Sequence, residues 1–478
     1  MDILRQPLIA SFLASRRARR CVQFVLLSAA VLLVLHGLFG PQIGPRNLAT
    51  VVTSIHWRGL LIVGLVLAAN LFCFSCPMML TRDAARRFVT PRLRWPRYLR
   101  GRWLALGLLA FTFFAYELWD LWDQPRATAW VILGYFGVAL AVDLTFKGAS
   151  FCKYVCPVGQ FNFMASTLSP TEVQIRSAET CRTCRTFECI RGDGGLGIGE
   201  RRSGIGDRGS GGARGCELGL FLPVKVGNLN CTMCFDCVRA CPHDNIGLMT
   251  RTPGAEWLSF HRRSGIGRVT DRLDLAALSL VFTSGALFTA FAMTAPGVAV
   301  ERGLGRVTGV TSDTLVFAMM FVMAVLIIPF AVVAATGWLT QTTGGALKTA
   351  IPFVHALVPL GVGVWLAHYG FHLLTGALTI VPVTQSAAID LLGVAALGEP
   401  LWNWVGLRSG TVFPLQIGVV LLAAAGSMGL IAAVSAREQS PPRLARVTIP
   451  WMVVIAAVAA VAVWIFMQPM DMRGIGPG

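Results

Sequence analysis

Four closely spaced cysteines are the residues of this chain best suited to chemistry. They follow the spacing C-x2-C-x2-C-x3-C and are closed by Pro242: Cys231, Cys234, Cys237 and Cys241. Three thiolates on a short turn can grip one iron–sulfur cube, and this spacing is typical of [4Fe–4S] ligation. A zinc ribbon is the structural alternative, but four cysteines this close with a trailing proline favour iron and sulfur. The run therefore predicts a redox cofactor that transfers single electrons.

A second, irregular set of cysteines precedes this run. It reads Cys181-x2-Cys184-x4-Cys189, and Cys216 follows after an intervening glycine-rich stretch. In two-cluster ferredoxins the fourth cysteine of each run ligates the other cluster. The sequence therefore predicts two [4Fe–4S] clusters with crossed ligands, although leftover structural cysteines remain the alternative for the first set. The predicted ligand sets are Cys181, Cys184, Cys189 and Cys241 for one cluster, and Cys231, Cys234, Cys237 and Cys216 for the other.

Two further cysteine pairs each end in Cys-Pro after an apolar stretch. They are Cys73-x2-Cys76-Pro77 and Cys152-x3-Cys156-Pro157. Four thiols at one membrane level could form a third cluster or metal site. They could instead be redox dithiols, whose thiolate form the nearby arginines and Lys153 would favour. The third interpretation is ordinary packing, because free cysteine behaves as a small hydrophobic residue.

The elements that must position these cysteines are mostly apolar. Of the 478 residues, 55% are hydrophobic and 14% are charged, whereas soluble domains carry roughly 25% charged residues. Nine windows approach the roughly 20 apolar residues that cross a bilayer. They lie at about Cys21–Phe39, Gly59–Leu80, Trp103–Trp122, Ala127–Ala149, Leu273–Thr294, Leu315–Leu339, Ile351–Thr375, Pro414–Ala436 and Val447–Met467. The sequence therefore predicts an α-helical polytopic membrane protein with about nine transmembrane helices.

The net charge of +17 is unevenly distributed along the chain. Eight arginines fall within Arg82–Arg102 and three within Arg437–Arg446, whereas Gln124–Thr128 and Ala295–Thr314 hold few basic residues. This asymmetry follows the positive-inside rule. It predicts a multi-pass protein of the bacterial cytoplasmic (inner) membrane, with the N-terminus and the cysteine-rich segment in the cytoplasm and the C-terminus outside. No motif that reads bases accompanies the charge, so we expect no nucleic-acid partner.

Three parts follow from these patterns. Residues 1–168 form a four-helix membrane domain with the Cys-Pro motifs, and residues 273–478 form a five-helix membrane domain. Residues 169–272 form an inserted cytoplasmic two-cluster ferredoxin-like domain, where disulfides are disfavoured. Within it, residues 190–215 hold 11 glycines among 26 residues. No strand precedes this stretch and no Lys-Ser/Thr follows it, so it is interpreted as a flexible insert and not as a phosphate loop.

The Cys-Pro pairs and the double cysteine run together resemble the membrane polyferredoxins of the NapH, NosR and CcoG type. The resemblance covers roughly residues 20–250, and Cys152-Lys153-Tyr154-Val155-Cys156-Pro157 fits the family pattern directly. It implies electron transfer linked to quinol or flavin, or metal reduction during cofactor maturation. The chain departs from the pattern at Cys73–Cys76, which is one residue shorter than the usual spacing. It also lacks a large flavin domain like that of NosR, and its five C-terminal helices lie outside the shared core.

Polar residues within the apolar windows are the remaining candidates. Four histidines fall toward the predicted outer side, and three interpretations are open: packing histidines, a haem or copper site, and proton acceptors for a quinol. Asp143 is a candidate proton carrier or quinone contact, or a partner of Lys147, whereas Glu117 is expected to be solvated. The four histidines are His36, His56, His368 and His372.

The leading hypothesis is a membrane-bound iron–sulfur protein that passes electrons between the quinone pool or a membrane partner and a respiratory redox enzyme. It would work as an electron-transfer subunit of an oxidoreductase complex, with a quinone or quinol and a redox protein as partners. The alternative is a copper reductase or assembly factor for a respiratory metalloenzyme, which the outer histidines and Met467, Met470 and Met472 would suit. A transporter with a regulatory iron–sulfur domain is a third hypothesis.

Overall fold

The structure is a computed structural model that describes residues 1–192, 214–259, 268–269, 272–342, 345–438 and 441–470. Most of the glycine-rich stretch and Met472 lie outside these ranges. The chain forms two compact units, each made of three stretches of sequence. Unit 1 comprises residues 1–31, 64–105 and 133–269, and unit 2 comprises residues 32–63, 106–132 and 270–478.

Eight helices in the described part of the chain are long and apolar enough to cross a membrane. This confirms the prediction of a helical, multi-pass membrane protein. The predicted third span, however, is a helix of only 16 residues, Trp103–Leu118. The eight long segments are Arg16–Phe39, Leu48–Ala68, Pro125–Thr145, Leu273–Ala292, Asp313–Leu339, Ala346–Thr375, Ser409–Arg437 and Arg443–Phe466.

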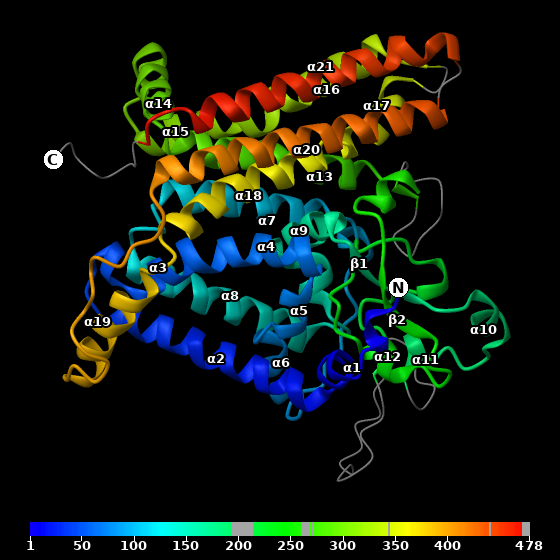
Figure 1. Cartoon of the computed structure of the whole chain (residues 1–478), viewed down its shortest axis with the longest axis horizontal. Coiled ribbons are helices and arrows are strands. Elements are labelled where there is room, and N and C mark those ends of the chain that lie inside the picture. The colour runs from blue at the N-terminus through cyan, green and yellow to red at the C-terminus, as the bar shows by residue number, and fades with distance from the viewer. Residues whose placement is uncertain (193–213, 260–267, 270–271, 343–344, 439–440, 471–478) are drawn as a thin grey trace. The chain divides into compact units, whose positions relative to one another are not determined.

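The elements of the two units can be followed in Figure 1. Four helices have residues in both units: α2 (Arg16–Phe39), α4 (Arg58–Ala68), α7 (Trp103–Leu118) and α8 (Pro125–Thr145). The other longer elements of unit 1 are α1 (Pro7–Leu13), α5 (Leu71–Ser75), α6 (Met78–Ala85), η5 (Phe151–Val155), α9 (Pro157–Ala165), β1 (Thr171–Ile175), α10 (Ala178–Thr183), α11 (Glu188–Arg191), α12 (Asp236–Ala240) and β2 (Ile246–Thr250). Those of unit 2 are α3 (Leu48–Val51), η3 (Val52–Trp57), α13 (Leu273–Ala292), α14 (Ala295–Thr308), α15 (Asp313–Phe321), η10 (Val322–Ile327), α16 (Ile328–Leu339), α17 (Ala346–His355), α18 (Val358–Thr375), α19 (Ile380–Leu392), α20 (Ser409–Glu438) and α21 (Pro441–Phe466).

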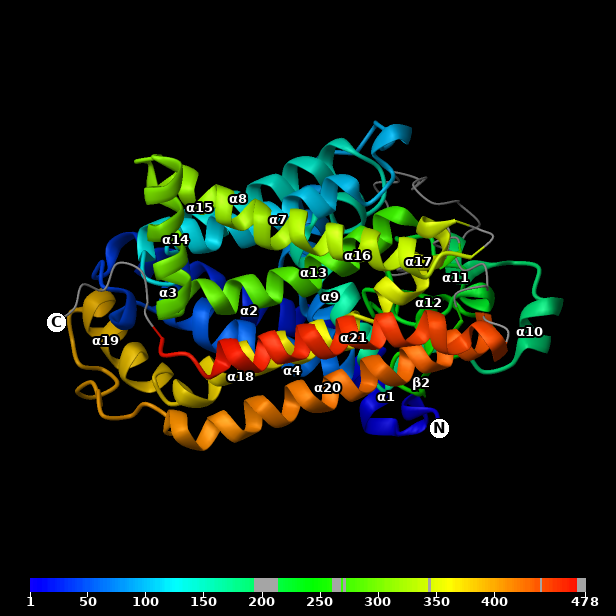
Figure 2. The same ribbon diagram turned by 90° about the horizontal axis from the view of Figure 1, so that it is seen from above.

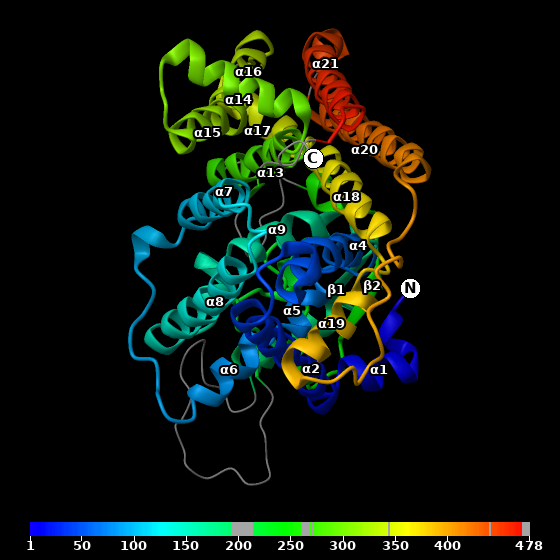
Figure 3. The same cartoon turned by 90° about the vertical axis from the view of Figure 1, so that its left-hand side faces the viewer.

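Unit 2 is a helical bundle whose core is formed by α13 and α18. Of the most apolar part of the spans Leu273–Ala292 and Ala346–Thr375, 89% and 94% is buried, against 17–33% in the other long spans. Trp365 of α18 anchors this core, because its ring lies 5.1 Å from that of Phe113 and its indole N–H donates to the Phe282 carbonyl at 3.0 Å. The α20 and α21 helices lie side by side (Figure 2), and α14 packs next to α15 (Figure 3).

The small sheet of unit 1 joins the two ends of the cysteine-rich segment. Strand β1 pairs antiparallel with β2, and Val173 lies opposite Leu248. Both of these side chains are buried. Since β1 precedes the first cysteine set and β2 follows the second, the pairing closes the segment into a single compact fold.

The sequence predicted that each Cys-Pro pair closes a long apolar helix. In the structure, both pairs instead begin in separate short helices. The α4 helix ends at Ala68, where Ala69 adopts a left-handed conformation with φ 54° and Asn70 starts the short helix α5. The Asn70 side chain caps α5 by accepting the Cys73 N–H at 3.4 Å. In the same way α8 ends at Thr145, before the separate helix η5 that carries Cys152. The apolar window hid the first break, because Leu71–Phe74 resume the apolar sequence directly after Asn70.

Candidate metal centres

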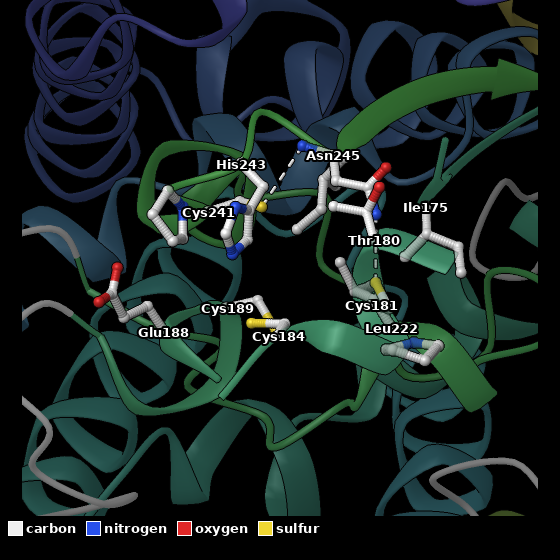
Figure 4. A pocket seen from close by; sticks show the side chains of 13 residues that line it. Ile175, Thr180, Cys181, Cys184, Glu188, Cys189, Leu222, Cys241, His243 and Asn245 are labelled. Carbon is white, nitrogen blue, oxygen red and sulfur yellow. Dashed lines mark hydrogen bonds between the residues drawn. The ribbon is translucent and has the colours of Figure 1, made fainter. Parts of the chain in front are cut away.

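The first predicted ligand set surrounds one pocket of unit 1 (Figure 4). The structure brings together Cys181 from α10, Cys184, Cys189 from α11, and Cys241, which directly follows α12. Figure 4 shows their sulfur atoms around a common space. The second predicted ligand set lines another pocket of the same unit: Cys216, Cys231, Cys234 and Cys237. The cysteines are thus grouped in the crossed arrangement. Cys241 of the second run joins the first set, and Cys216, which precedes that run, joins the second.

A local structural repeat explains this grouping. Phe187 and Phe235 both adopt left-handed conformations, with φ 52° and 56°, and each is followed by an acidic residue and a cysteine in a short helix. The two copies therefore read Phe-Glu-Cys189 and Phe-Asp-Cys237. The gap between Cys184 and Cys189 is two residues longer than the gap between Cys234 and Cys237. The extra residues, Arg185 and Thr186, lie before the repeat begins. The sequence-based interpretation missed this signal, which the shared aromatic–acid–cysteine order could have revealed.

Hydrogen-bond donors point at the sulfur atoms of both pockets. Asn245 serves two cysteines of the first set, since its side-chain amide donates to Cys181 Sγ at 3.2 Å and its backbone N–H to Cys241 Sγ at 3.4 Å. In the second pocket the Leu220 N–H donates to Cys216 Sγ at 3.4 Å. Such donors tune the reduction potential of thiolate-bound clusters. The sequence pattern did not single out Asn245 or Leu220.

The thiols differ in how easily they lose a proton. Backbone N–H groups of Phe187 and Thr186 lower the pKa of Cys184. Burial raises the pKa of Cys189 to about 11 and that of Cys237 well above its ordinary value. Thiolates are the metal-binding form, so most of these sites must release protons when a metal binds.

The four Cys-Pro cysteines also come together in unit 1. Cys73 lies within electrostatic range of Cys76 and Cys156, and Cys152 lies within range of the same two residues. Both Cys-Pro junctions open a helix: α6 follows Cys76-Pro77, and α9 begins at Pro157. The Cys156 thiol accepts the Gly159 N–H of α9 at 3.0 Å.

Side chains from other elements complete the surroundings of these thiols. The Tyr135 hydroxyl lies 2.8 Å from Cys156 Sγ, and the amide of the fully buried Asn162 lies 3.7 Å from Cys73 Sγ. Removal from water raises the pKa of Cys156 to about 12 and that of Cys152 well above its ordinary value. The predicted stabilisation of thiolates by nearby arginines is therefore outweighed for the metal-free thiols.

Direct contacts connect the three groups of cysteines. The Cys216 N–H donates to the Cys189 carbonyl at 2.8 Å, which joins the two pockets. Asn70 connects the second pocket to the Cys-Pro group, because its side chain donates to the Cys231 carbonyl at 3.2 Å while it caps the helix that holds Cys73. The ring of Phe74, next to Cys73, lies 5.9 Å from that of Phe235.

Arg19 reinforces the second of these connections. Its guanidinium donates to the Phe74 carbonyl at 3.1 Å and to the Asp236 carboxylate at 3.3 Å. Phe74 lies between the cysteines of the first Cys-Pro pair, and Asp236 lies between Cys234 and Cys237. The three groups are therefore neighbours within one unit, in the order first pocket, second pocket, Cys-Pro group.

No three or more His, Cys, Asp or Glu side chains within the described ranges are arranged to hold a single metal ion. A zinc site needs about four ligands at roughly 2–2.3 Å from one ion. A [4Fe–4S] cube instead takes each of its four thiolates at a separate iron, so its ligands surround a larger volume.

The four candidate histidines fall into two kinds. Both ring nitrogens of His36 are engaged, with the Asp390 carboxylate at 3.1 Å and the Leu48 N–H at 3.0 Å. Both ring nitrogens of His56 face backbone carbonyls, at 3.3 and 3.2 Å. In contrast, the buried Nε2 atoms of His368 and His372 have no hydrogen-bond partner among the described residues. Only these last two therefore offer a free nitrogen to a ligand or a proton.

Arg58 lies near the two free histidine nitrogens in unit 2. Its guanidinium stacks on the rings of Tyr116 and Tyr369 at 4.3 and 4.7 Å, and the His368 and His372 rings are 5.1 Å apart. Glu117 is 3% exposed, so the prediction that it is solvated is wrong.

Asp143 has a structural role in unit 1. Its carboxylate accepts the Phe151 N–H at 3.0 Å and lies 3.9 Å from the Arg82 guanidinium. Arg82, only 1% exposed, also pairs with Glu217 at 2.8 Å. These contacts hold η5, α6 and the segment around Cys216 together.

No family model, curated protein or solved structure matches this chain. The fold itself defines the class: a helical protein with several helices able to cross a membrane, whose unit 1 gathers twelve of its thirteen cysteines into three groups of four.

Proposed function

We propose that this chain is a membrane-bound iron–sulfur electron-transfer protein. The observation that carries the proposal is the presence of two pockets, each lined by four cysteines in the crossed sets of a two-cluster ferredoxin. Each pocket would hold one [4Fe–4S] cluster, which supplies one-electron chemistry. Residues of the chain would hold the clusters in place, keep water away from their sulfurs and set their potentials through N–H donors such as those of Asn245.

The close connection between the pockets supports electron transfer between them. The backbone contact between Cys189 and Cys216 fixes the separation of the two sites, and the sheet of β1 and β2 ties both ends of the segment together. With the Cys-Pro group as their neighbour, the pockets would pass electrons toward or from the membrane. The resemblance to the NapH, NosR and CcoG polyferredoxins supports the same role, with a respiratory redox enzyme as the partner.

A quinol is the membrane partner that unit 2 supports best. Oxidation of a quinol releases two protons, and a neutral imidazole nitrogen without a hydrogen-bond partner can accept one. The free Nε2 atoms of His368 and His372 meet this requirement. The arginine asymmetry of the sequence supports a cytoplasmic location of the cysteine-rich segment in a bacterial inner membrane.

Chemical analysis of the full chain, purified in detergent without oxygen, tests the proposed function. We expect at least about eight irons and eight sulfides per chain, since each cube holds about four of each, and an EPR signal on reduction with dithionite. The Cys237→Ala variant should lose the second cluster, whereas Cys21→Ala, which removes an exposed cysteine outside the three groups, should match the parent. A colourless protein without iron and sulfide, or one that specifically binds copper instead, would contradict the proposal.

A further inference from the structure

We propose that the Cys-Pro group is a third iron–sulfur site, whose ligands are Cys73, Cys76, Cys152 and Cys156. The inference rests on the proposed function, because it assumes a protein that receives clusters. It adds a third cofactor position to unit 1, beside the two pockets of the proposed function.

The two Cys-Pro pairs have the same local structure. In each pair the first cysteine lies in a short helix, α5 or η5, and the second lies at a Cys-Pro junction that opens a helix of eight or nine residues. The backbones of Cys76 and Cys156 agree closely, with φ/ψ of −59°/119° and −58°/108°. The Cys156 thiol also accepts a backbone N–H from the helix that follows. Two elements that present cysteines in the same way form a matched set of four ligands.

One helix contacts both pairs, and this favours one shared site over two separate dithiols. Asn162 of α9, the helix that begins directly after Cys156, places its amide 3.7 Å from Cys73 Sγ. A dithiol that forms a disulfide needs only its own partner, with the two Cβ atoms about 3.8 Å apart. A cluster needs four thiolates from different parts of the chain around one volume. Cysteines of both pairs beside one helix, α9, favour the second arrangement.

The polar surroundings of the thiols are not those of cysteines that only fill an apolar core. Tyr135 and Asn162 place a hydroxyl and an amide next to Cys156 and Cys73. Asn162 is fully buried, and its side-chain N–H donates to Cys73 Sγ. Such a donor stabilises a thiolate more than a thiol, because hydrogen bonds to ionised acceptors are the stronger ones.

The location beside the second pocket gives this site a role. Asn70 joins the backbone at Cys231 to the helix that carries Cys73, and Phe74 lies against Phe235. One electron that leaves the cluster of the second pocket would reduce the third cluster by one electron, or the reverse. No proton or further reactant is needed for this exchange. The third cluster would therefore connect the soluble-type clusters to the membrane helices.

Counting iron separates this inference from the proposed function. The full chain, purified without oxygen, should contain about ten irons if the third site holds a [2Fe–2S] cluster, or about twelve if it holds a cube. The double variant Cys76→Ser/Cys156→Ser should fall to about eight irons and keep the EPR signals of the other two clusters. The control Cys21→Ser should keep the parental iron content.

Each outcome has a defined meaning. About eight irons in the parent chain, unchanged in the double variant, would overturn the third site and leave the proposed function intact. Absence of iron from the parent would overturn both. Should the double variant fail to fold, Mössbauer spectra of the parent still decide, because they count the iron sites directly. Tyr135→Phe, which removes the hydroxyl at Cys156, should alter only the signal of the third cluster, and an unaltered set of signals would also count against the site.

Discussion

At the scale of single residues, the buried ion pairs of unit 1 determine how the cysteines are held. Glu217 directly follows Cys216, and its carboxylate lies 2.8 Å from the guanidinium of Arg82. Arg82 and Arg214 together lower the pKa of Glu217 to about 2, although burial alone would raise it. Breaking a buried pair leaves an uncompensated charge, which destabilises a protein strongly.

The low pKa of Glu217 makes a prediction about acid stability. A carboxyl whose pKa is lower in the folded protein stabilises it above its ordinary pKa of 4.5, and this contribution is lost as pH falls toward 2. We expect up to about 3 kcal/mol to be lost between about pH 5 and pH 2. Thermal unfolding in detergent, followed by tryptophan fluorescence, measures this change in stability.

Two variants make the acid test specific. Glu217→Gln should be less stable at neutral pH and should show a weaker dependence on pH in this range. Glu179→Gln, which removes an exposed pair with Arg182 at 3.1 Å, should behave like the parent, because exposed pairs contribute little. The same dependence on pH in both variants would contradict the assignment to Glu217.

At the scale of elements, the short helices α11 and α12 are copies of one motif. Each begins after a left-handed phenylalanine, and each presents one cysteine to a different pocket. The first copy differs only by Arg185 and Thr186, which precede the motif. These two residues therefore lengthen the loop without changing the part that presents Cys189.

Deletion of Arg185 and Thr186 tests this interpretation of the repeat. We expect the shortened chain to retain its iron and sulfide, because the first set then takes the C-x2-C-x2-C spacing of the second. The potential of the first cluster should shift, since the Thr186 N–H and hydroxyl at Cys184 are lost. Deletion of Phe235 and Asp236, which removes part of the motif itself, should abolish the second cluster. Loss of iron from the first deletion would show that the two copies are not equivalent.

The cysteine sets were predictable from the sequence because ligand spacing depends on residues close together in the chain. The crossed grouping followed from the same rule and agrees with the two pockets. The break at Ala69 and the start of α5 were not predictable, because an apolar window does not record a left-handed backbone. Donors such as Leu220 escape sequence patterns for a related reason: a backbone N–H belongs to every residue except proline.

At the scale of the whole molecule, the two units divide the proposed chemistry. Unit 1 holds the cysteines, and unit 2 holds the buried polar group around Arg58, His368 and His372. The sequence indicated His368 and His372 through their spacing of one helical turn. It did not indicate that His36 and His56 are already hydrogen-bonded, because their partners Asp390 and Ala377 are distant in the chain.

The proposed use of a quinol predicts separate effects on the two units. Replacing His368 or His372 by leucine should slow cluster reduction by a soluble quinol at least about tenfold, since a positioned base contributes this much or more. Stopped-flow absorbance measures this rate. Reduction by dithionite and the iron content should remain unchanged, because unit 1 is intact.

The control for this prediction is His56→Gln. His56 contacts only backbone carbonyls through its ring nitrogens, so its replacement should leave quinol reduction near the parental rate. Equal slowing in all three variants would indicate a general disturbance of unit 2. Unchanged rates in His368→Leu and His372→Leu would exclude these residues as proton acceptors.

The hydrogen bond between Cys189 and Cys216 has one further consequence. The chain leaves the cysteine-rich segment after Cys189 and returns to the same point at Cys216, with 26 residues in between. The entropy of closing such a detour grows only with the logarithm of its length. An affinity tag, a fluorophore or an entire small protein inserted there would therefore disturb neither pocket, and this position offers a handle for imaging or capturing the protein at work.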